Sequence, residues 1–291
     1  MITINLDTLN QKKISANSGH HVYPYGDSHV VKIHQAASPE SLSDKLREIV
    51  LGFNHDHPRI VANKGLFVQQ EEKSWSIFTV MPKMPKDFAQ VIDQRRKIDN
   101  PFNKDRIIEY MYTLVDVHEY LQLKGITNGN LKPSNIFFNE NEEIFVSDIG
   151  LKHHEVTGTL RTIDDVPFGD PHYLAPEILD APDKVNISQE VLAQGDVWSL
   201  GVIILELCLL ERVKVGEKFH DKRIEEMIAR CKERYGPKIS TLLENMLRFD
   251  PKNRWSFQDC KVYIEKTIFN VVKPGFNIYI NPINCMNQIG V

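Results

Sequence analysis

The chain has 291 residues, with 35 lysines and arginines against 39 aspartates and glutamates, and a formal net charge of −4 at pH 7. Its 42% hydrophobic and 25% charged residues are typical of a soluble globular protein and exclude disordered, collagen-like and membrane classes. The charge balance lacks the positive field that a phosphate backbone requires, so we expect no nucleic-acid partner. The length favours a bilobal, enzyme-sized fold.

The cysteines and the apolar segments indicate a cytoplasmic protein. Four cysteines lie far apart with no Cys-x-x-Cys pair, so neither a zinc site nor a disulfide framework is predicted. Residues 1–13 are too polar for a signal peptide. The longest apolar run, 197–210, contains Glu206 and is too short to span a bilayer, so we expect a buried helix and no membrane contact.

The first part of the chain predicts strands and one helix. β-rich runs at 30–33 and 75–81 are bounded by Gly, Asp and Pro, as strands are. Between them, Ser38 can cap a helix that begins at Pro39. Apolar residues recur there at helical spacing and should pack on the sheet: Leu42, Leu46, Ile49, Val50 and Phe53.

From about residue 106 onward, helical patterns dominate. The stretch 82–101, with its prolines, is the predicted hinge and linker between two lobes. An amphipathic helix is expected over 107–121, ended by Gly125. A β-hairpin is expected at 136–138 and 144–146, with functional loops beside it. Later helices are indicated at 197–210, 223–233 and 239–247.

Several motifs follow one another in the order found in protein kinases. The sequence Asn-Gly-Asn-Leu-Lys-Pro-Ser-Asn at 128–135 stands where kinases carry His-Arg-Asp-Leu-Lys-Pro-x-Asn, and Asp-Ile-Gly at 148–150 stands where they carry Asp-Phe-Gly. Three later segments resemble the end of an activation segment, the start of the central helix and a late arginine motif: 169–177, 196–201 and 250–254. From about residue 14 to 268 the chain therefore resembles a protein kinase, of the Ser/Thr type by its Lys-Pro-Ser-Asn loop.

The resemblance implies an α+β, bilobal fold with a small β-rich lobe carrying one helix and a larger helical lobe. The implied kinase-like domain covers 1–268, with an N-terminal lobe of about 1–81, a hinge and linker of about 82–101 and a C-terminal lobe of about 102–268. Residues 269–291 form a C-terminal extension that either packs on the lobe or reaches a partner.

The resemblance also implies a nucleotide cleft. Lys32 would place its ammonium against ATP phosphates, and Glu48 would hold Lys32 as an ion pair. By pattern alone, the two would be an ordinary surface lysine and a solvated helix glutamate. Asn135 and Asp148 offer oxygens suited to Mg²⁺, although a capping Asn and a turn Asp are the alternative. Met81 is the expected gatekeeper.

Other matched residues are expected to build the helical lobe. In the family, a carboxylate in the position of Asp196 accepts backbone N–H bonds from the catalytic loop. Glu177 and Arg254 are the predicted buried ion pair. Asp170 stands where Ser/Thr kinases carry a Thr, and we hypothesise that it pairs with Lys132 of the catalytic loop and locks that loop in place.

The chain departs from a working kinase first at Asn130. This residue replaces the aspartate that accepts the proton of the substrate hydroxyl, and an amide cannot take that proton at neutral pH. Loss of a general base typically costs ~10²–10⁴-fold in rate. Phosphoryl transfer depends mainly on positioning and electrostatics, which leaves room for residual transfer.

Further departures affect alignment and phosphate binding. Active kinases are aligned by a stack of apolar side chains. Here that stack would be polar and underfilled, because its positions are taken by Asn128, Gly52 and Ile149. Only Gly19 and Gly26 stand where a glycine-rich loop should let backbone N–H groups approach phosphates. The residues expected above and below adenine are larger than usual and could narrow the slot or simply be core residues: Val30 and Phe137.

We therefore interpret the chain as a pseudokinase that acts as a protein-binding scaffold or allosteric module, with ATP and Mg²⁺ weakly bound or absent. Its partners would be other proteins in a complex, with no nucleic acid and no membrane. The chain also resembles the kinase-like region of TBC-domain-containing kinase proteins, through the substituted base at Asn130, the segment 171–177 and the long stretch between Glu177 and Asp196. The alternative is an atypical active Ser/Thr kinase that uses Lys32, Glu48, Lys132, Asn135 and Asp148.

Overall fold

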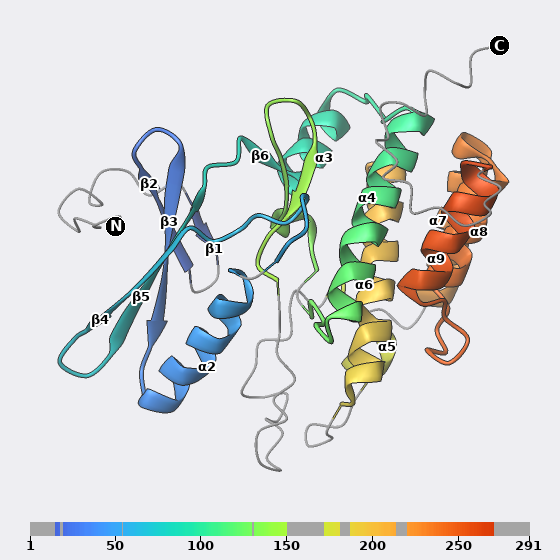
Figure 1. Cartoon of the computed structure of the whole chain (residues 1–291). Coiled ribbons are helices and arrows are strands. Elements are labelled where there is room, and N and C mark those ends of the chain that lie inside the picture. Colours follow the sequence, from blue (N-terminus) through green and yellow to red (C-terminus); the bar gives the residue numbers. More distant parts are fainter. Residues whose placement is uncertain are drawn as a thin grey trace.

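The computed structural model describes residues 15–17, 20–53, 55–129, 131–149, 172–180, 187–213 and 220–270, without the side chains of 15–17, 20, 48, 220 and 221. A β-rich lobe with one helix lies beside a helical lobe (Figure 1). The α+β, bilobal prediction is therefore confirmed.

An antiparallel sheet of five strands in the order β1-β2-β3-β5-β4 forms the N-terminal lobe. The strands are β1 (Ser15–Asn17), β2 (His20–Tyr25), β3 (His29–Ala36), β4 (Gly65–Gln70) and β5 (Trp75–Pro82). β3 and β5 are the two predicted strands, and their register places Lys32 opposite Thr79. Because side chains alternate along a strand, Val31, Phe78 and Val80 share a separate cluster, while Lys32 and Thr79 turn toward the helical lobe.

Helix α2 (Pro39–Leu51) packs on this sheet. Ser38 Oγ accepts a hydrogen bond from the Ser41 N–H at 3.2 Å, which is the predicted cap. Ile49 joins Ala36 and Ile77 in a buried cluster that is extended by the predicted residues Leu42, Leu46 and Phe53. Val50 was wrongly assigned to the packed stripe: it is 45% exposed, because the residue after Ile49 is rotated about 100° around the helix.

A short strand and a helix follow β5, within the range predicted as hinge and linker. They are β6 (Lys86–Asp87) and α3 (Phe88–Lys97). Asp87 Oδ1 caps α3 by accepting from the Gln90 N–H at 2.8 Å, and Phe88 and Ile92 are buried in the core of the helical lobe. The sequence pattern did not predict α3, because prolines precede it and its surface is highly charged.

The helical lobe is built around α4 (Lys104–Leu123) and α6 (Gln189–Leu209). Gly125, with φ +69°, follows the end of α4 as predicted. The other helices are α5 (Pro176–Leu179), α7 (His220–Tyr235), α8 (Pro237–Met246), α9 (Phe257–Tyr263) and the π-helical turn η2 (Ile264–Ile268). α6 is long and apolar enough to cross a membrane by composition, but 83% of its most apolar window is buried inside the protein, as in a core helix.

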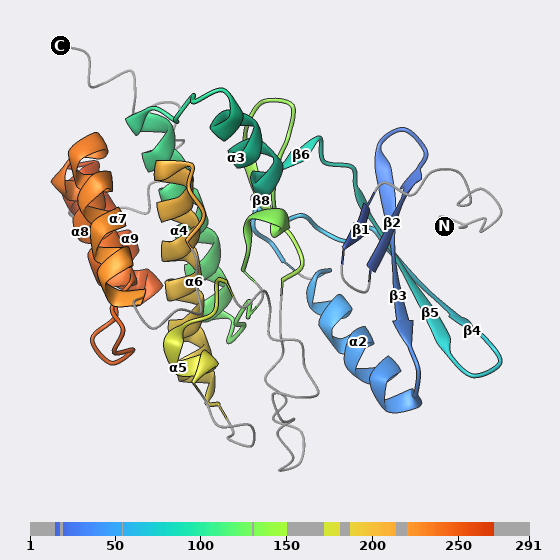
Figure 2. The ribbon, with the colours of Figure 1, turned by 180° about the vertical axis from the view of Figure 1, so that it is seen from behind.

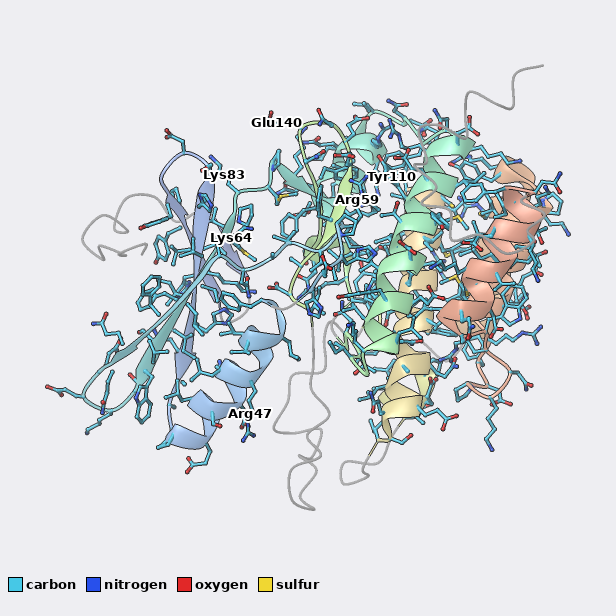
Figure 3. The ribbon with its side chains drawn as sticks, viewed as in Figure 1. Arg47, Arg59, Lys64, Lys83, Tyr110 and Glu140 are labelled. Carbon is cyan, nitrogen blue, oxygen red and sulfur yellow. The ribbon has the colours of Figure 1, made fainter. Side chains whose placement is uncertain are left out.

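The predicted hairpin lies between the two lobes (Figures 1 and 2). The 3-10 turn η1 (Pro133–Asn135) precedes its strands β7 (Ile136–Phe138) and β8 (Ile144–Val146). Arg59, labelled in Figure 3, lies beside the hairpin, where its guanidinium pairs with Glu143 at 2.9 Å. Val146 donates its N–H to Arg59 O at 2.8 Å and accepts from the Val61 N–H at 2.9 Å, so the segment after α2 is fastened to β8.

Candidate functional site

The centre of the cleft is an ion pair between the lobes. Lys32 Nζ on β3 lies 2.7 Å from Asp148 Oδ2, just after β8, and the side chains are 11% and 29% exposed. Asp148 has φ 53°, a left-handed conformation that is costly for a non-glycine residue and is often found at functional sites. The Glu48 side chain lies outside the described residues, so its pairing with Lys32 stays a prediction.

Asn135 is buried and fastened to the same segment. Its backbone N–H donates to Lys132 O at 3.0 Å, and its carbonyl accepts from the Ser147 N–H at 2.9 Å. This second bond places Asn135 beside the residue that precedes Asp148. Their amide and carboxylate oxygens are the hard ligands that Mg²⁺ prefers, so these residues fit the predicted metal, and Lys32 supplies a positive charge for phosphates.

The catalytic loop is held from below by Asp196 of α6. Asp196 is buried, and its carboxylate accepts hydrogen bonds from the Asn128 N–H at 2.5 Å and the Gly129 N–H at 2.8 Å. These are the contacts that the resemblance implies. Burial raises the pKa of Asp196 to about 7, while the two backbone donors act to lower it.

The Glu177 and Arg254 side chains form the implied buried pair. Arg254 Nη1 lies 2.6 Å from Glu177 Oε1, and Nη2 lies 3.0 Å from Oε2. The guanidinium also donates to Gln194 O at 2.8 Å and lies 5.2 Å from the Trp198 ring centroid. A fully covered arginine with this many partners anchors α5 to α6.

Glu206 has a role that the sequence pattern did not predict, since there it only interrupts an apolar run. Glu206 Oε2 accepts from the Tyr173 hydroxyl at 3.0 Å, and Oε1 accepts from the Val213 N–H at 2.8 Å. Burial raises the pKa of Glu206 to about 7. A charged residue within a buried apolar helix needs partners, and that was the available signal.

A cavity of about 30 Å³ lies behind the ion pair. Met81, the predicted gatekeeper at the end of β5, lines it together with Lys32 and Asp148. Four lining residues were not predicted: His34, Val61, Asn63 and Thr79. Three of these side chains are polar, and with Ile49, Val61 and Ile149 they give the cavity a lining that is partly polar and partly apolar.

The assignment of Gly26 to the phosphate loop is wrong. Gly26 lies in the turn between β2 and β3 with φ +63°, a conformation that glycine adopts without steric cost. β1 and β2 pair as far as Asn17 and His20, and Gly19, which lies between these positions in the sequence, is outside the described residues. Val30 on β3 is buried, whereas Phe137 on β7 is half-buried.

Two expectations for the catalytic loop lie outside the described residues, because they concern Asn130 and Asp170. The Lys132 side chain is described and half-buried, and within the described part of the chain it makes no ion pair. The proposed lock between Asp170 and Lys132 therefore stays a hypothesis.

A profile of the protein kinase domain family matches residues 24–263. The chain belongs to the protein kinase family. This kinase domain is 29% identical over 229 residues to CBL-interacting protein kinase 26 of Oryza sativa subsp. japonica, covering 74% of this chain and 41% of that protein. It is 28% identical over 202 residues to serine/threonine-protein kinase Nek11 of Macaca fascicularis, covering 68% of this chain and 30% of that protein.

A shorter match reaches higher identity. Mitogen-activated protein kinase kinase 10 of Arabidopsis thaliana is 39% identical over 102 residues, which is 34% of this chain and 31% of that protein. The kinase domain thus spans less than half the length of these three relatives. Protein kinase domains bind ATP and Mg²⁺, which agrees with the ligand types that meet at Lys32, Asn135 and Asp148.

Proposed function

We propose that this kinase domain is a pseudokinase that serves partner proteins as a scaffold or allosteric module and holds Mg²⁺ and ATP weakly. The observation that carries the proposal is Asn130 in the position of the catalytic aspartate. The frame around that position is built, since Asp196 holds the backbone of Asn128 and Gly129. The protein therefore keeps the kinase shape without the group that accepts the proton.

Weak rather than strong nucleotide binding follows from the ion pair. Lys32 and Asp148 satisfy each other at 2.7 Å, so an incoming phosphate and Mg²⁺ must compete with that contact. The glycine-rich loop that strengthens phosphate binding is also depleted, because Gly26 belongs to another turn. When bound, Mg²⁺ would neutralise phosphate charge between Asn135 and Asp148.

The proposed partners are other proteins, in the cytoplasm. The net charge of −4 gives no reason to expect nucleic acid, and the apolar helix α6 is used in the core. The second candidate is an atypical active Ser/Thr kinase that works with Lys32, Glu48, Lys132, Asn135 and Asp148. It is favoured by the retained loop support from Asp196.

A phosphotransfer assay with the purified chain, labelled ATP and a mixture of Ser/Thr peptides tests the proposal. We expect no more than trace transfer by the natural chain, since loss of a general base costs ~10²–10⁴-fold. Asn130→Asp should raise transfer steeply, while Asn141→Asp, the same change in an exposed turn of the hairpin, should not. Transfer by the natural chain at a rate that Asn130→Asp fails to increase would overturn the proposal in favour of the active kinase.

A further inference from the structure

Gly52 ends α2 in a conformation that any residue could adopt. Its φ of −67° and ψ of −5° are helical, so backbone freedom does not explain a glycine there. The lack of space explains it, because a Cβ atom on Gly52 would lie 2.5 Å from Asn63 Nδ2 and 3.3 Å from Asn63 Cγ. The Asn63 side chain therefore occupies the volume that a side chain at position 52 would need.

Asn63 also bonds to the end of α2. Its side-chain Nδ2 donates to Ile49 O at 3.3 Å, and its backbone N–H donates to Gly52 O at 3.1 Å. The last carbonyls of a helix lack partners within the helix. Asn63 thus supplies a partner for Gly52 O through its backbone. Through its side chain it adds a second donor to Ile49 O, which already accepts from the Gly52 N–H at 3.0 Å.

The same segment is fixed at its other end to the strand that leads to Asp148. Ile60 forms a parallel bridge with Val146 of β8, and the Val61 N–H donates to Val146 O at 2.9 Å. Residues 60–63 therefore form a short hydrogen-bonded link between β8 and the C-terminal end of α2. Asn63, Gly52 and Asp148 all border the cavity behind the cleft.

We propose that Asn63 is a positioning residue that holds the end of α2 against the Asp148 segment. Here a polar contact replaces the apolar stack that Gly52 cannot complete, and it does so with or without nucleotide. The consequence for ATP binding rests on the proposed function, because α2 carries Glu48 one turn before Gly52. The link itself does not depend on that function.

A double-mutant cycle of Gly52→Ala and Asn63→Ala tests the contact by chemical unfolding. Gly52→Ala alone should destabilise the chain, because the new methyl group meets the Asn63 amide. In the Asn63→Ala background the same change should cost little, since the obstacle is gone, so the two effects are not additive. Additive effects would overturn the proposal.

Hydrogen exchange in the absence of nucleotide separates positioning from general stability. Two variants are compared: Asn63→Ala, and Asn63→Asp, which keeps the shape of the side chain but loses its hydrogen-bond donor. We expect both to speed amide hydrogen exchange in residues 47–53 at least tenfold. Exchange in β5 should stay unchanged. Equal acceleration in both regions would contradict a positioning role. A titration of the natural chain with Mg²⁺ and ATP tests the proposed nucleotide site separately. If no binding is measured, the nucleotide site is refuted, but the proposed role of Asn63 is unaffected.

Discussion

Arg254 and Glu177 meet through two parallel hydrogen bonds, 2.6 and 3.0 Å long, between positions separated by 77 residues. The Arg254 side chain is completely covered, so this pair belongs to the core of the helical lobe. Its presence beside Asp196, which holds the catalytic loop, means that the helical lobe keeps its kinase frame independently of the substituted catalytic position.

Glu177→Ala should destabilise the chain by about 3–5 kcal/mol, because it leaves the Arg254 charge buried without a negative charge to balance it. Urea unfolding measures the loss. Glu211→Ala is the matched control: Glu211 pairs with Arg223 and Arg230 at the surface, where such pairs contribute about 0–1 kcal/mol. Similar losses in the two variants would contradict the assignment of the first pair to the core.

The buried Glu206 predicts a pH dependence of stability. Its pKa is raised from 4.5 to about 7 in the folded chain, so the folded state binds the proton more tightly than the unfolded state. This contribution is complete below pH 4.5 and is lost as the pH rises to about 7, by about 3 kcal/mol. Glu206→Gln should remove this component between pH 5 and about 7, measured as the difference between the unfolding free energies of the two chains. A difference that does not change with pH would refute the prediction.

Asp116 joins the two lobes through α4. Its carboxylate lies 3.2 Å from His57 Nε2, in the segment after α2, and 2.8 Å from Lys261 Nζ on α9. Burial alone would raise the pKa of Asp116, but the bonds from His57 and Lys261 hold it below its usual value. Its contribution to stability is therefore present above pH 3.8 and is lost as the pH falls through the folded pKa.

Asp116→Asn should cost about 1 kcal/mol at pH 7, since a carboxylate that is 35% exposed is partly screened by water. Thermal unfolding at pH 7 measures this loss. Asp93→Asn, which removes an exposed carboxylate paired with Arg96 on α3, should have an effect close to zero. An Asp116→Asn variant as stable as the Asp93→Asn variant would show that the link between the lobes contributes nothing.

The sequence predicted those helices and strands that are determined by residues close together in the chain. The hairpin at 136–138 and 144–146 and the helix capped by Ser38 have the predicted bounds within a residue or two, because alternation, turn residues and caps act over a few positions. α3 was missed because two prolines before it indicated a break, although the Asp87 cap was present in the sequence. Gly26 was misplaced because a glycine signals a turn without saying which one.

The site depended on contacts between distant positions. Lys32 and Asp148 are 116 residues apart, and only the family resemblance predicted that both lie in one cleft. The sequence gave no signal for Asn63, because its role depends on two segments meeting in the fold, where its side chain fills the space that a side chain at position 52 would need. Glu206 similarly needed the fold to supply Tyr173 as a partner.

The most direct test of a pseudokinase with a weak nucleotide cleft is thermal unfolding with Mg²⁺ and millimolar ATP against Mg²⁺ alone. At about ten times its Kd, a ligand stabilises the folded state by ~1.4 kcal/mol, which raises the midpoint by several degrees. We predict such a rise in the natural chain and in Lys64→Met, an exposed control, but not in Lys32→Met, which removes the cation of the cleft. The same midpoint with and without ATP in the natural chain, or a rise that persists in Lys32→Met, would contradict this account.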